Sequence, residues 1–402
     1  MKYIIILGDG MADEPIAELG GKTPLQAAYT PSMDWIARNG RCGQLKSVPD
    51  GYAPGSEVAN LAILGYNLDA VFEGRGSLEA ASMGVKIEDN EVAMRCNLIC
   101  VQDGKIKNHS AGHISNEEAT ELINYMQQEL GGGDISLYPG ISYRHLLKIK
   151  GGDKRIKCTP PHDVPGTPCA EVMLQAEVSE ADETARKINE LIIKSQELLP
   201  LHPVNIKREA EGKDPANSLW PWSPGYRPAM QTFQQQYGIE SGAVISAVDL
   251  IKGIGVYAGL TPIEVEGATG LYNTNYEGKA EAAIEALKTN DFLFLHVEAS
   301  DEAGHEGDWE LKKRTIEYLD SRIIAPILEA MPTLGDELTI ALLPDHPTPC
   351  RLRTHTRNAV PFAIYTPGVE PDDVTEYNEE SVKQGSYATL RGEQFIKEIF
   401  KK

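Results

Sequence analysis

The segment FLFLHVEASDEAGHE (292–306) places an apolar run directly before a cluster of carboxylates and imidazoles. The same arrangement recurs in YIIILGDGMAD (3–13) and in LTIALLPDHPTP (338–349). Each apolar run is too short and too uniformly apolar for an amphipathic helix, so each predicts a buried β-strand. Polar side chains that follow buried strands are a common way for an α/β protein to build a metal site, and the three segments predict such a site.

Helical patterns separate the late strands. They cover 277–288 and 309–329, and a further strand is predicted at VPFAIYT (360–366). Alternation of strand and helix predicts a mostly parallel sheet covered by helices. The first strand, YIIIL (3–7), is expected to join this sheet although it lies far away in the sequence.

The middle of the chain predicts a different architecture. A hairpin is expected at 91–108 around Asp103-Gly104, followed by a helix at 116–130, a strand at 141–149 and a helix at 179–198. Hairpins with helices predict a separate α+β domain inserted into the α/β domain. The expected boundaries are 1–78 and 232–402 for the discontinuous α/β domain and 79–231 for the insertion, with the Pro-rich segment 220–228 as the return hinge.

Composition excludes several partners. The 402 residues carry a formal net charge of −21, which argues against nucleic acid or an anionic membrane as the partner. No apolar run approaches the ~20 residues of a membrane span. The six cysteines form no C-x-x-C pair and indicate reduced thiols. Without a secretion signal at the N-terminus, we expect a cytoplasmic protein; its oligomeric state stays open.

Six side chains are candidate metal ligands. Asp301 and His305 are four residues apart and would share one face of a helix. The full set is Asp9, Asp301, His305, Asp345, His346 and His355. Taken singly, a helical Asp-x-x-x-His is usually a surface pair and an Asp-His-Pro is usually a turn. Together they predict a metal site, and mixed nitrogen and oxygen ligation suits Mn²⁺ or Zn²⁺ better than Mg²⁺.

Ser56 precedes the helical pattern ANLAILGY (59–66) and has two interpretations. It is well placed as an N-cap residue, which alone would be the simpler reading. The positive potential of a helix N-terminus also favours an alkoxide and an incoming phosphate, and a nearby metal would lower the pKa of the hydroxyl further. Beside a metal site, the sequence favours Ser56 as a nucleophile.

These motifs, in this order, resemble the cofactor-independent phosphoglycerate mutases of archaeal type, within the alkaline phosphatase superfamily. The similarity spans the chain, from LGDGMAD (7–13) and PGSEVANLAILGYN (54–67) to the late motifs. It implies an alkaline-phosphatase-like α/β fold, with a mostly parallel sheet sandwiched by helices and an inserted α+β domain that grips the substrate. It also implies two divalent ions (Mn²⁺ or Zn²⁺, with Mg²⁺ as a further option) and interconversion of 3- and 2-phosphoglycerate through a phosphoserine.

Residue by residue, the resemblance implies that Asp301, His305 and His355 hold one metal, and that Asp9, Ser56, Asp345 and His346 hold the other. Lys252 resembles the lysine that reaches the phosphoryl group, although a solvent-exposed helix lysine is an equal alternative. Further matches imply substrate contacts, although any one of them could be an ordinary surface residue. They are Arg95, Asn97, His109, His113, Arg144, His162 and Asp163.

One segment departs from the family pattern. In the archaeal-type mutases the segment after this hairpin is Arg-rich and resembles D-R-R-A-G-R, whereas this chain has NHSAGH (108–113). Neutral imidazole holds phosphate and carboxylate less well than bidentate arginine. The departure resembles the branch proposed to act as homoserine kinases, in which Asp163 or a nearby acid would pair with an ammonium group. Mutase and kinase therefore stay open, with a phosphohydrolase third and a non-enzymatic binding protein last; use of a nucleotide donor is also open.

Overall fold

The computed structural model describes residues 1–335 and 337–401 and divides the chain into two compact units. Unit 1 comprises Met1–Phe72 and Ala229–Lys402, and unit 2 comprises Glu73–Pro228. The expected boundaries assigned 73–78 to the first domain and 229–231 to the insertion, and the structure reverses both. Helix α5 (Arg75–Ser82) explains the first difference because it packs on strand β3 (Glu91–Gln102) of unit 2. A Cβ at Gly76 would lie 2.6 Å from Met94 Cα, so glycine permits this close approach.

Unit 1 is built on one large sheet. Among its described residues, eight strands run in the order β11-β10-β12-β1-β13-β14-β2-β15. The five from β11 to β13 are parallel, whereas β14 is antiparallel to both of its neighbours. The bounds are β1 Lys2–Gly8, β2 Arg41–Lys46, β10 Gly242–Ile245, β11 Thr261–Pro262, β12 Phe292–Val297, β13 Leu338–Leu343, β14 Val360–Tyr365 and β15 Thr389–Arg391.

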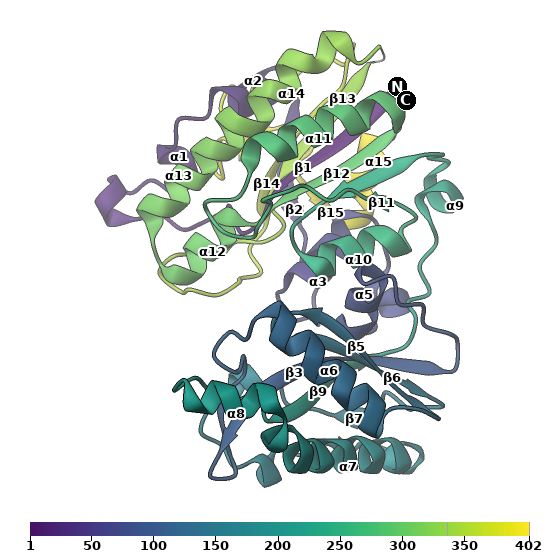
Figure 1. The fold of residues 1–402 in the computed structure, drawn as a ribbon. Coiled ribbons are helices and arrows are strands. Elements are labelled where there is room, and N and C mark those ends of the chain that lie inside the picture. The colour runs from purple at the N-terminus through teal and green to yellow at the C-terminus, as the bar shows by residue number, and fades with distance from the viewer. Residues whose placement is uncertain (336, 402) are drawn as a thin grey trace. The chain divides into compact units, whose positions relative to one another are not determined.

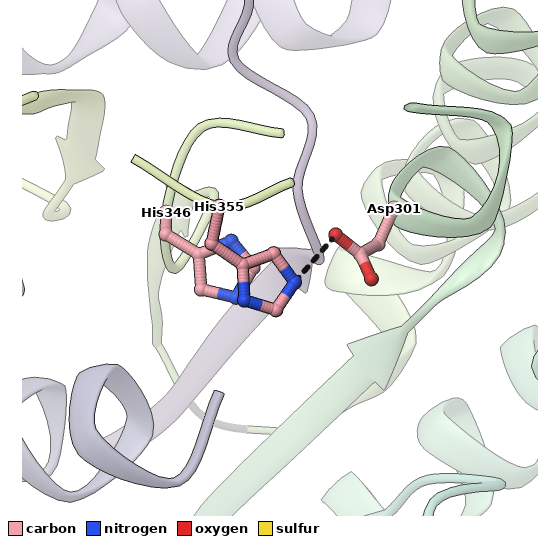
Figure 2. Close-up of side chains that lie close together, drawn as sticks. All are labelled: Asp301, His346 and His355. Carbon is pink, nitrogen blue, oxygen red and sulfur yellow. Dashed lines mark ion pairs between the residues drawn. The ribbon is translucent and has the colours of Figure 1, made fainter. Parts of the chain in front are cut away.

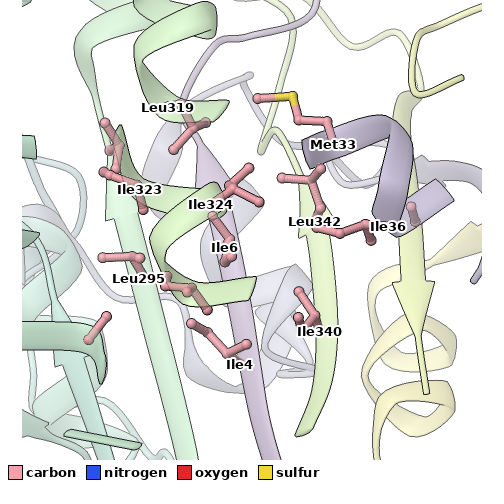
Figure 3. Packing of buried hydrophobic residues seen from close by; sticks show 14 of the residues in the cluster. Ile4, Ile6, Met33, Ile36, Leu295, Leu319, Ile323, Ile324, Ile340 and Leu342 are labelled. Atoms are coloured by element: carbon pink, nitrogen blue, oxygen red, sulfur yellow. The ribbon is translucent and has the colours of Figure 1, made fainter. Parts of the chain in front are cut away.

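Helices cover one face of this sheet through a continuous apolar core. Figure 3 shows Ile4, Leu295 and Leu342 of the central strands packed beneath side chains of the covering helices. This layer contains α2 (Pro31–Asn39), α11 (Tyr276–Thr289), α13 (Trp309–Leu319) and α14 (Ala325–Ala330). Uniformly buried strands are what a parallel sheet with both faces covered requires.

The helix predicted at 309–329 is confirmed in its extent, but it is not α-helical throughout. A π-helical turn at Asp320–Ile324 separates α13 from α14. The turn brings Asp320 to the start of α2, where its Oδ1 accepts a hydrogen bond from Met33 N at 2.7 Å. The π-helical turn is therefore hydrogen-bonded to α2, which lies in the same helical layer. No local sequence pattern specifies this contact.

The opposite face carries α3 (Ser56–Ile63), α9 (Phe233–Tyr237), α10 (Asp249–Tyr257) and α15 (Gly392–Ile399). Aromatic contacts fasten this layer: the ring centroids of Phe233 and Phe292 are 4.8 Å apart, and those of Phe362 and Phe395 are 5.2 Å apart. Shorter helices complete the unit, namely α1 (Pro24–Ala27), α4 (Leu68–Val71) and α12 (Ala299–Glu306). A mostly parallel sheet lies between two helical layers, which confirms the predicted fold class (Figure 1).

Unit 2 is an α+β structure with its own core. Its antiparallel sheet comprises β3, β4 (Lys105–Asn108), β5 (Ile135–Ile141), β6 (Arg144–Lys150) and β9 (Ser218–Gly225). Helices α6 (Asn116–Leu130) and α7 (Asp182–Leu198) supply apolar side chains such as Leu122 and Ile188 to the core. The unit also contains α8 (Pro203–Ala210) and the short pair β7 (Ile156–Lys157) and β8 (Gln175–Ala176).

One expectation for the middle of the chain is wrong, and another needs a shifted boundary. The segment 220–228, expected as a hinge, lies mostly in β9, which pairs with β3 from Ser218 to Gly225. Among the described residues β9 pairs only with β3, so it has one unpaired edge, and proline is tolerated in such a strand. The strand predicted at 141–149 is confirmed as β6 from Arg144 onward, but it begins too early, because Ile141 ends β5 and Ser142 adopts a left-handed φ of 54° in the turn between the two strands.

Within residues 1–335 and 337–401, no helix is both long enough and apolar enough to cross a bilayer.

Candidate metal centre and nucleophile

The candidate ligands of unit 1 gather at the carboxyl ends of three adjacent strands. Asp9 directly follows β1, Asp301 lies in α12 just after β12, and Asp345 follows β13. These strands are neighbours in the order β12-β1-β13 and run parallel. In open parallel sheets the carboxyl ends of the strands are where ligands bind, so the topology brings distant segments to one site.

Three of these residues, Asp9, Asp345 and His346, form a buried triad. Their ligand atoms lie within 4.8 Å of one another. His346 Nε2 is 3.4 Å from Asp345 Oδ2 and 3.7 Å from Asp9 Oδ1. Asp345 accepts hydrogen bonds from Gly10 N at 3.1 Å, His346 N at 2.9 Å and Asn60 Nδ2 at 3.0 Å. The surrounding protein therefore orients this carboxylate.

Asp301, His305 and His355 form an outer triad beside it. Asp301 Oδ2 is 3.1 Å from His305 Nε2, and Asp301 Oδ1 is 3.4 Å from His355 Nε2. The two imidazoles face each other, with 3.0 Å between their Nε2 atoms. The side chain of His305 is 36% exposed, so this triad is open to solvent whereas the buried triad is not.

His346 connects the two triads. Its ring stacks on that of His355 with a centroid separation of 3.9 Å, and its ligand atom also lies within 4.8 Å of those of Asp301 and His355. Figure 2 shows the stacked imidazoles and the carboxylate of Asp301 directed toward them. Thr348 Oγ1 hydrogen-bonds both Asp301 Oδ1 and, at 3.3 Å, His346 Nδ1. The triads are parts of one centre.

Electrostatics differ between the triads. Burial, together with the charges of Asp345 and Asp301, raises the pKa of Asp9 well above its usual value. Burial also opposes ionisation of Asp301, but hydrogen bonds from His305 and His355 outweigh it and lower the pKa of this carboxyl. The hydrogen bond to Asp301 raises the pKa of His305 to about 9, whereas burial lowers the pKa of His346.

The residues fit a divalent cation. Asp9 Oδ1 is fully buried and has no hydrogen-bond partner among the described residues, an arrangement that is costly unless a ligand satisfies it. The Nε2 atoms of His305 and His355 lie 3.0 Å apart next to a carboxylate, so the ligand atoms of this triad converge on a common point. His305 Nδ1 lies 3.0 Å from Arg353 O, a contact that leaves Nε2 available for a metal. The donor set of carboxylates and imidazoles is one that Mn²⁺ and Zn²⁺ accept.

Ser56 lies beside the buried triad but is not the N-cap residue of α3, so that interpretation is wrong. Gly55 occupies the cap position, and Ser56 is the first helical residue. Its Oγ lies 3.2 Å from His346 Nε2, while Asn60 Nδ2 donates to Ser56 O at 2.8 Å. Because the side chain does not cap its own helix, the hydroxyl faces the centre.

Lys252 lies in α10 of unit 1. Its Nζ is 2.8 Å from Glu264 Oε1 and 3.8 Å from Asp249 Oδ1. The side chain is 12% exposed, so Lys252 is not the solvent-exposed helix lysine of the alternative interpretation.

The candidate substrate contacts all belong to unit 2. Arg95 and Asn97 are buried on β3, where Arg95 Nη1 donates to Glu79 Oε1 at 2.8 Å and Asn97 Oδ1 accepts from Trp222 Nε1 at 3.0 Å. The rings of His109 and His162 have centroids 5.9 Å apart, and His162 also contacts Trp222. His113 adopts a left-handed φ of 55°, His162 Nε2 lies 3.6 Å from Asp163 Oδ1, and Arg144 is exposed over Tyr143.

Sequence reasoning missed four polar residues that contact this centre or the loops that carry it. His296, Asn60 and Thr348 contact ligand carboxylates, and Lys312 Nζ binds the carbonyls of Ala12 and Thr348. The sequence offered a signal only for His296, which is the one polar residue in FLFLHV.

Comparison with known proteins places this geometry in a family. The family model for 2,3-bisphosphoglycerate-independent phosphoglycerate mutase matches residues 37–205. A protein of that name from Methanosarcina acetivorans is 53% identical over 399 residues, which is 98% of each chain. A solved structure from Pyrococcus horikoshii is 31% identical with a TM-score of 0.84, over 99% of this chain and 97% of that one. A cofactor-independent phosphoglycerate mutase from Thermoplasma acidophilum is 26% identical with a TM-score of 0.69, over 99% of each chain.

Fold and site define an α/β protein with a carboxylate–imidazole centre at the carboxyl end of a parallel sheet. The full-length relatives make the identification specific: the chain belongs to the 2,3-bisphosphoglycerate-independent phosphoglycerate mutase family. The resemblance drawn from its motifs is confirmed.

Proposed function

We propose that the protein interconverts 3-phosphoglycerate and 2-phosphoglycerate by transferring the phosphoryl group to Ser56 and back to the glycerate. The observation that carries the proposal is the placement of the Ser56 hydroxyl, 3.2 Å from His346 Nε2 beside the candidate metal centre. Support also comes from the 53%-identical relative that bears the mutase name.

The two triads provide places for two divalent cations. We assign one ion to Asp301, His305 and His355, and the other to Asp9, Asp345, His346 and the Oγ of Ser56. When bound, the ions would supply positive charge that lowers the pKa of the Ser56 hydroxyl and neutralises the transferring phosphoryl group. Mn²⁺ or Zn²⁺ suits the mixed donors best, and Mg²⁺ is the third candidate.

The protein residues then have separate roles. Ser56 Oγ attacks the phosphorus and gives up its proton, while the bond from phosphorus to the first glycerate oxygen breaks and that oxygen takes up a proton. The other glycerate hydroxyl then attacks the phosphoserine and gives up its proton, and Ser56 Oγ leaves and regains one. The N-terminus of α3 places positive potential at Ser56. Lys252 would bind the phosphoryl oxygens. Binding of the glycerate part is assigned to unit 2 residues, namely Arg95, Asn97, His109, His113, Arg144, His162 and Asp163.

A second acceptor class follows from the same residues of unit 2. Arg95 is committed to Glu79, and burial lowers the pKa of both His109 and His162. These groups offer little full positive charge to a highly anionic phosphoglycerate. A zwitterionic hydroxy amino acid such as homoserine, phosphorylated from a nucleotide, is therefore the alternative substrate.

One pair of assays separates these functions. Purified protein with Mn²⁺ is supplied either with 3-phosphoglycerate or with homoserine and ATP, and the products are quantified together with free phosphate. We expect 2-phosphoglycerate from the first reaction. Phosphorylation of homoserine by ATP, without any conversion of 3-phosphoglycerate, would show that the enzyme is a kinase and not a mutase. Release of inorganic phosphate without isomerisation would make the enzyme a phosphohydrolase.

A further inference from the structure

His296 is a completely buried histidine whose two ring nitrogens both have partners. It is the penultimate residue of β12, directly next to β1 in the sheet. Its Nε2 lies 2.9 Å from Asp9 Oδ2, and its Nδ1 lies 3.0 Å from Ser246 Oγ. Neither the motifs nor the assigned ligands give this residue a role.

The hydrogen-bond chain determines which nitrogen of His296 carries the proton. Ser246 Oγ accepts a hydrogen bond from Val248 N at 3.0 Å, so the serine hydroxyl is free to donate its own proton to His296 Nδ1. Because Nδ1 then accepts, the neutral ring carries its proton on Nε2 and donates it to Asp9 Oδ2. The opposite tautomer would set the Nε2 lone pair against a carboxylate oxygen.

The same chain leaves Asp9 with one committed oxygen and one free oxygen. Oδ2 accepts from His296, whereas Oδ1 is buried without a partner among the described residues and lies 3.7 Å from His346 Nε2. The backbone is held as well, because Ser300 Oγ donates to Asp9 O at 2.6 Å. Residues 296 and 300, on either side of the β12–α12 junction, thus fix both the side chain and the main chain of Asp9.

We propose that His296 is a positioning residue that presents Asp9 to the buried-triad ion through Oδ1 alone, and that Ser246 holds His296 in the required tautomer. Because the role concerns a ligand of the assigned metal centre, it rests on the metal assignment within the proposed function and not on the substrate. Partners of metal ligands at this distance usually change metal affinity by about 10–100-fold when removed.

Ser246 also links this relay to the helix that carries Lys252. It follows β10, and the backbone of Val248, which accepts from Lys252 N at 3.0 Å, is the N-cap of α10. Lys279, itself completely buried, donates to His296 O at 3.4 Å. A single turn therefore sets the start of α10 and the orientation of His296.

The test is Mn²⁺ binding to the metal-free full-length protein, measured by calorimetric titration. His296→Leu removes the donor at similar bulk and should weaken one of two ions by about 10–100-fold while leaving the other unchanged. His296→Gln keeps an N–H donor near the Nε2 position and should recover most of the affinity. His145→Leu, a matched buried histidine on β6 of unit 2, should leave both affinities at the wild-type value.

Unchanged Mn²⁺ affinity in His296→Leu, or an equal loss in His145→Leu, would overturn the proposal. If His296→Leu does not fold, Ser246→Ala provides the decision, since a wild-type affinity there would show that the relay has no influence on the metal. Binding is measured without substrate. Failure to isomerise 3-phosphoglycerate would therefore refute the proposed function and leave the role of His296 standing.

Discussion

The two triads of the centre are held in different ways. The carboxylates of the buried triad are bound by the protein: Asp345 accepts three hydrogen bonds, and Asp9 accepts one from His296. In the outer triad Asp301 lies between His305 and His355, and each of these imidazoles contacts its carboxylate; Thr348 and the carbonyl of Arg353 supply the further contacts. The buried triad is thus shaped by the fold, whereas the outer triad depends on charges that a cation would replace.

One centre thus combines a buried triad of rigidly held ligands with an outer triad that solvent can reach. A buried ligand set loses little order when an ion binds, because its rotamers are already fixed. A solvent-open set carries a proton where the ion would bind, as the raised pKa of His305 indicates. The account therefore predicts unequal responses to mutation, to destabilisation and to pH.

The largest effect is expected from loss of a buried ligand. Asp345→Ala should lower turnover of 3-phosphoglycerate on the order of 10⁴-fold at any Mn²⁺ concentration, since no other side chain can take its place. His305→Ala should cost on the order of 10²-fold and recover partly at high Mn²⁺, because two outer ligands remain. Steady-state rates across a Mn²⁺ series decide this, and equal, metal-independent losses would contradict it.

A smaller effect is expected from the loss of Lys312, a lysine that contacts the loops carrying the buried triad. Lys312 is completely buried, and its Nζ binds Asp13 Oδ2 at 2.8 Å, Ala12 O at 3.1 Å and Thr348 O at 2.8 Å. Lys312→Met leaves the Asp13 carboxylate without its cation, and should lower the free energy of unfolding by about 3–5 kcal/mol in a urea titration.

The matched control for Lys312 is an ion pair on the surface. Arg322 pairs with Glu277 at 2.6 Å, and both side chains are partly exposed. Arg322→Gln should cost less than about 1 kcal/mol because solvent screens such a pair. Similar losses in the two variants would mean that the buried lysine does not fasten these loops.

The smallest effect is expected from the protonation of His305. His305 has its pKa raised from its usual value of 6.5 to about 9. In metal-free protein its proton therefore contributes stability that is fully present below pH 6.5 and is lost as the pH rises through about 9. An ion at the outer triad must displace that proton.

Calorimetric Mn²⁺ titrations at pH 8, in two buffers of different ionisation enthalpy, measure the displaced proton. The wild type should release about one proton more than His305→Gln, and the affinity of the outer ion should rise with pH up to about 9. Identical proton release in both proteins would show that His305 is neutral before the metal binds.

Local signals account for what the sequence could predict. Asp9 and Asp345 each follow an uninterrupted apolar strand, and Asp301 and His305 are spaced for one helical face, so short segments were enough. The contacts that organise the centre are not local. Asp9 and His296 are 287 residues apart, and Lys312 is 300 residues from Ala12. The hinge expected at 220–228 failed for a related reason, because this Pro-rich segment forms a strand by pairing with β3, which lies far away in the sequence.

The central claim is that Ser56 carries the phosphoryl group during turnover. The direct measurement is mass spectrometry of peptides from enzyme quenched while it converts 3-phosphoglycerate in Mn²⁺, with Ser56→Ala beside it. The account predicts phosphate on the Ser56 peptide of the wild type, and a variant that retains Mn²⁺ binding but neither phosphate nor turnover. An active Ser56→Ala enzyme, or phosphate on a histidine of the centre instead, would contradict it.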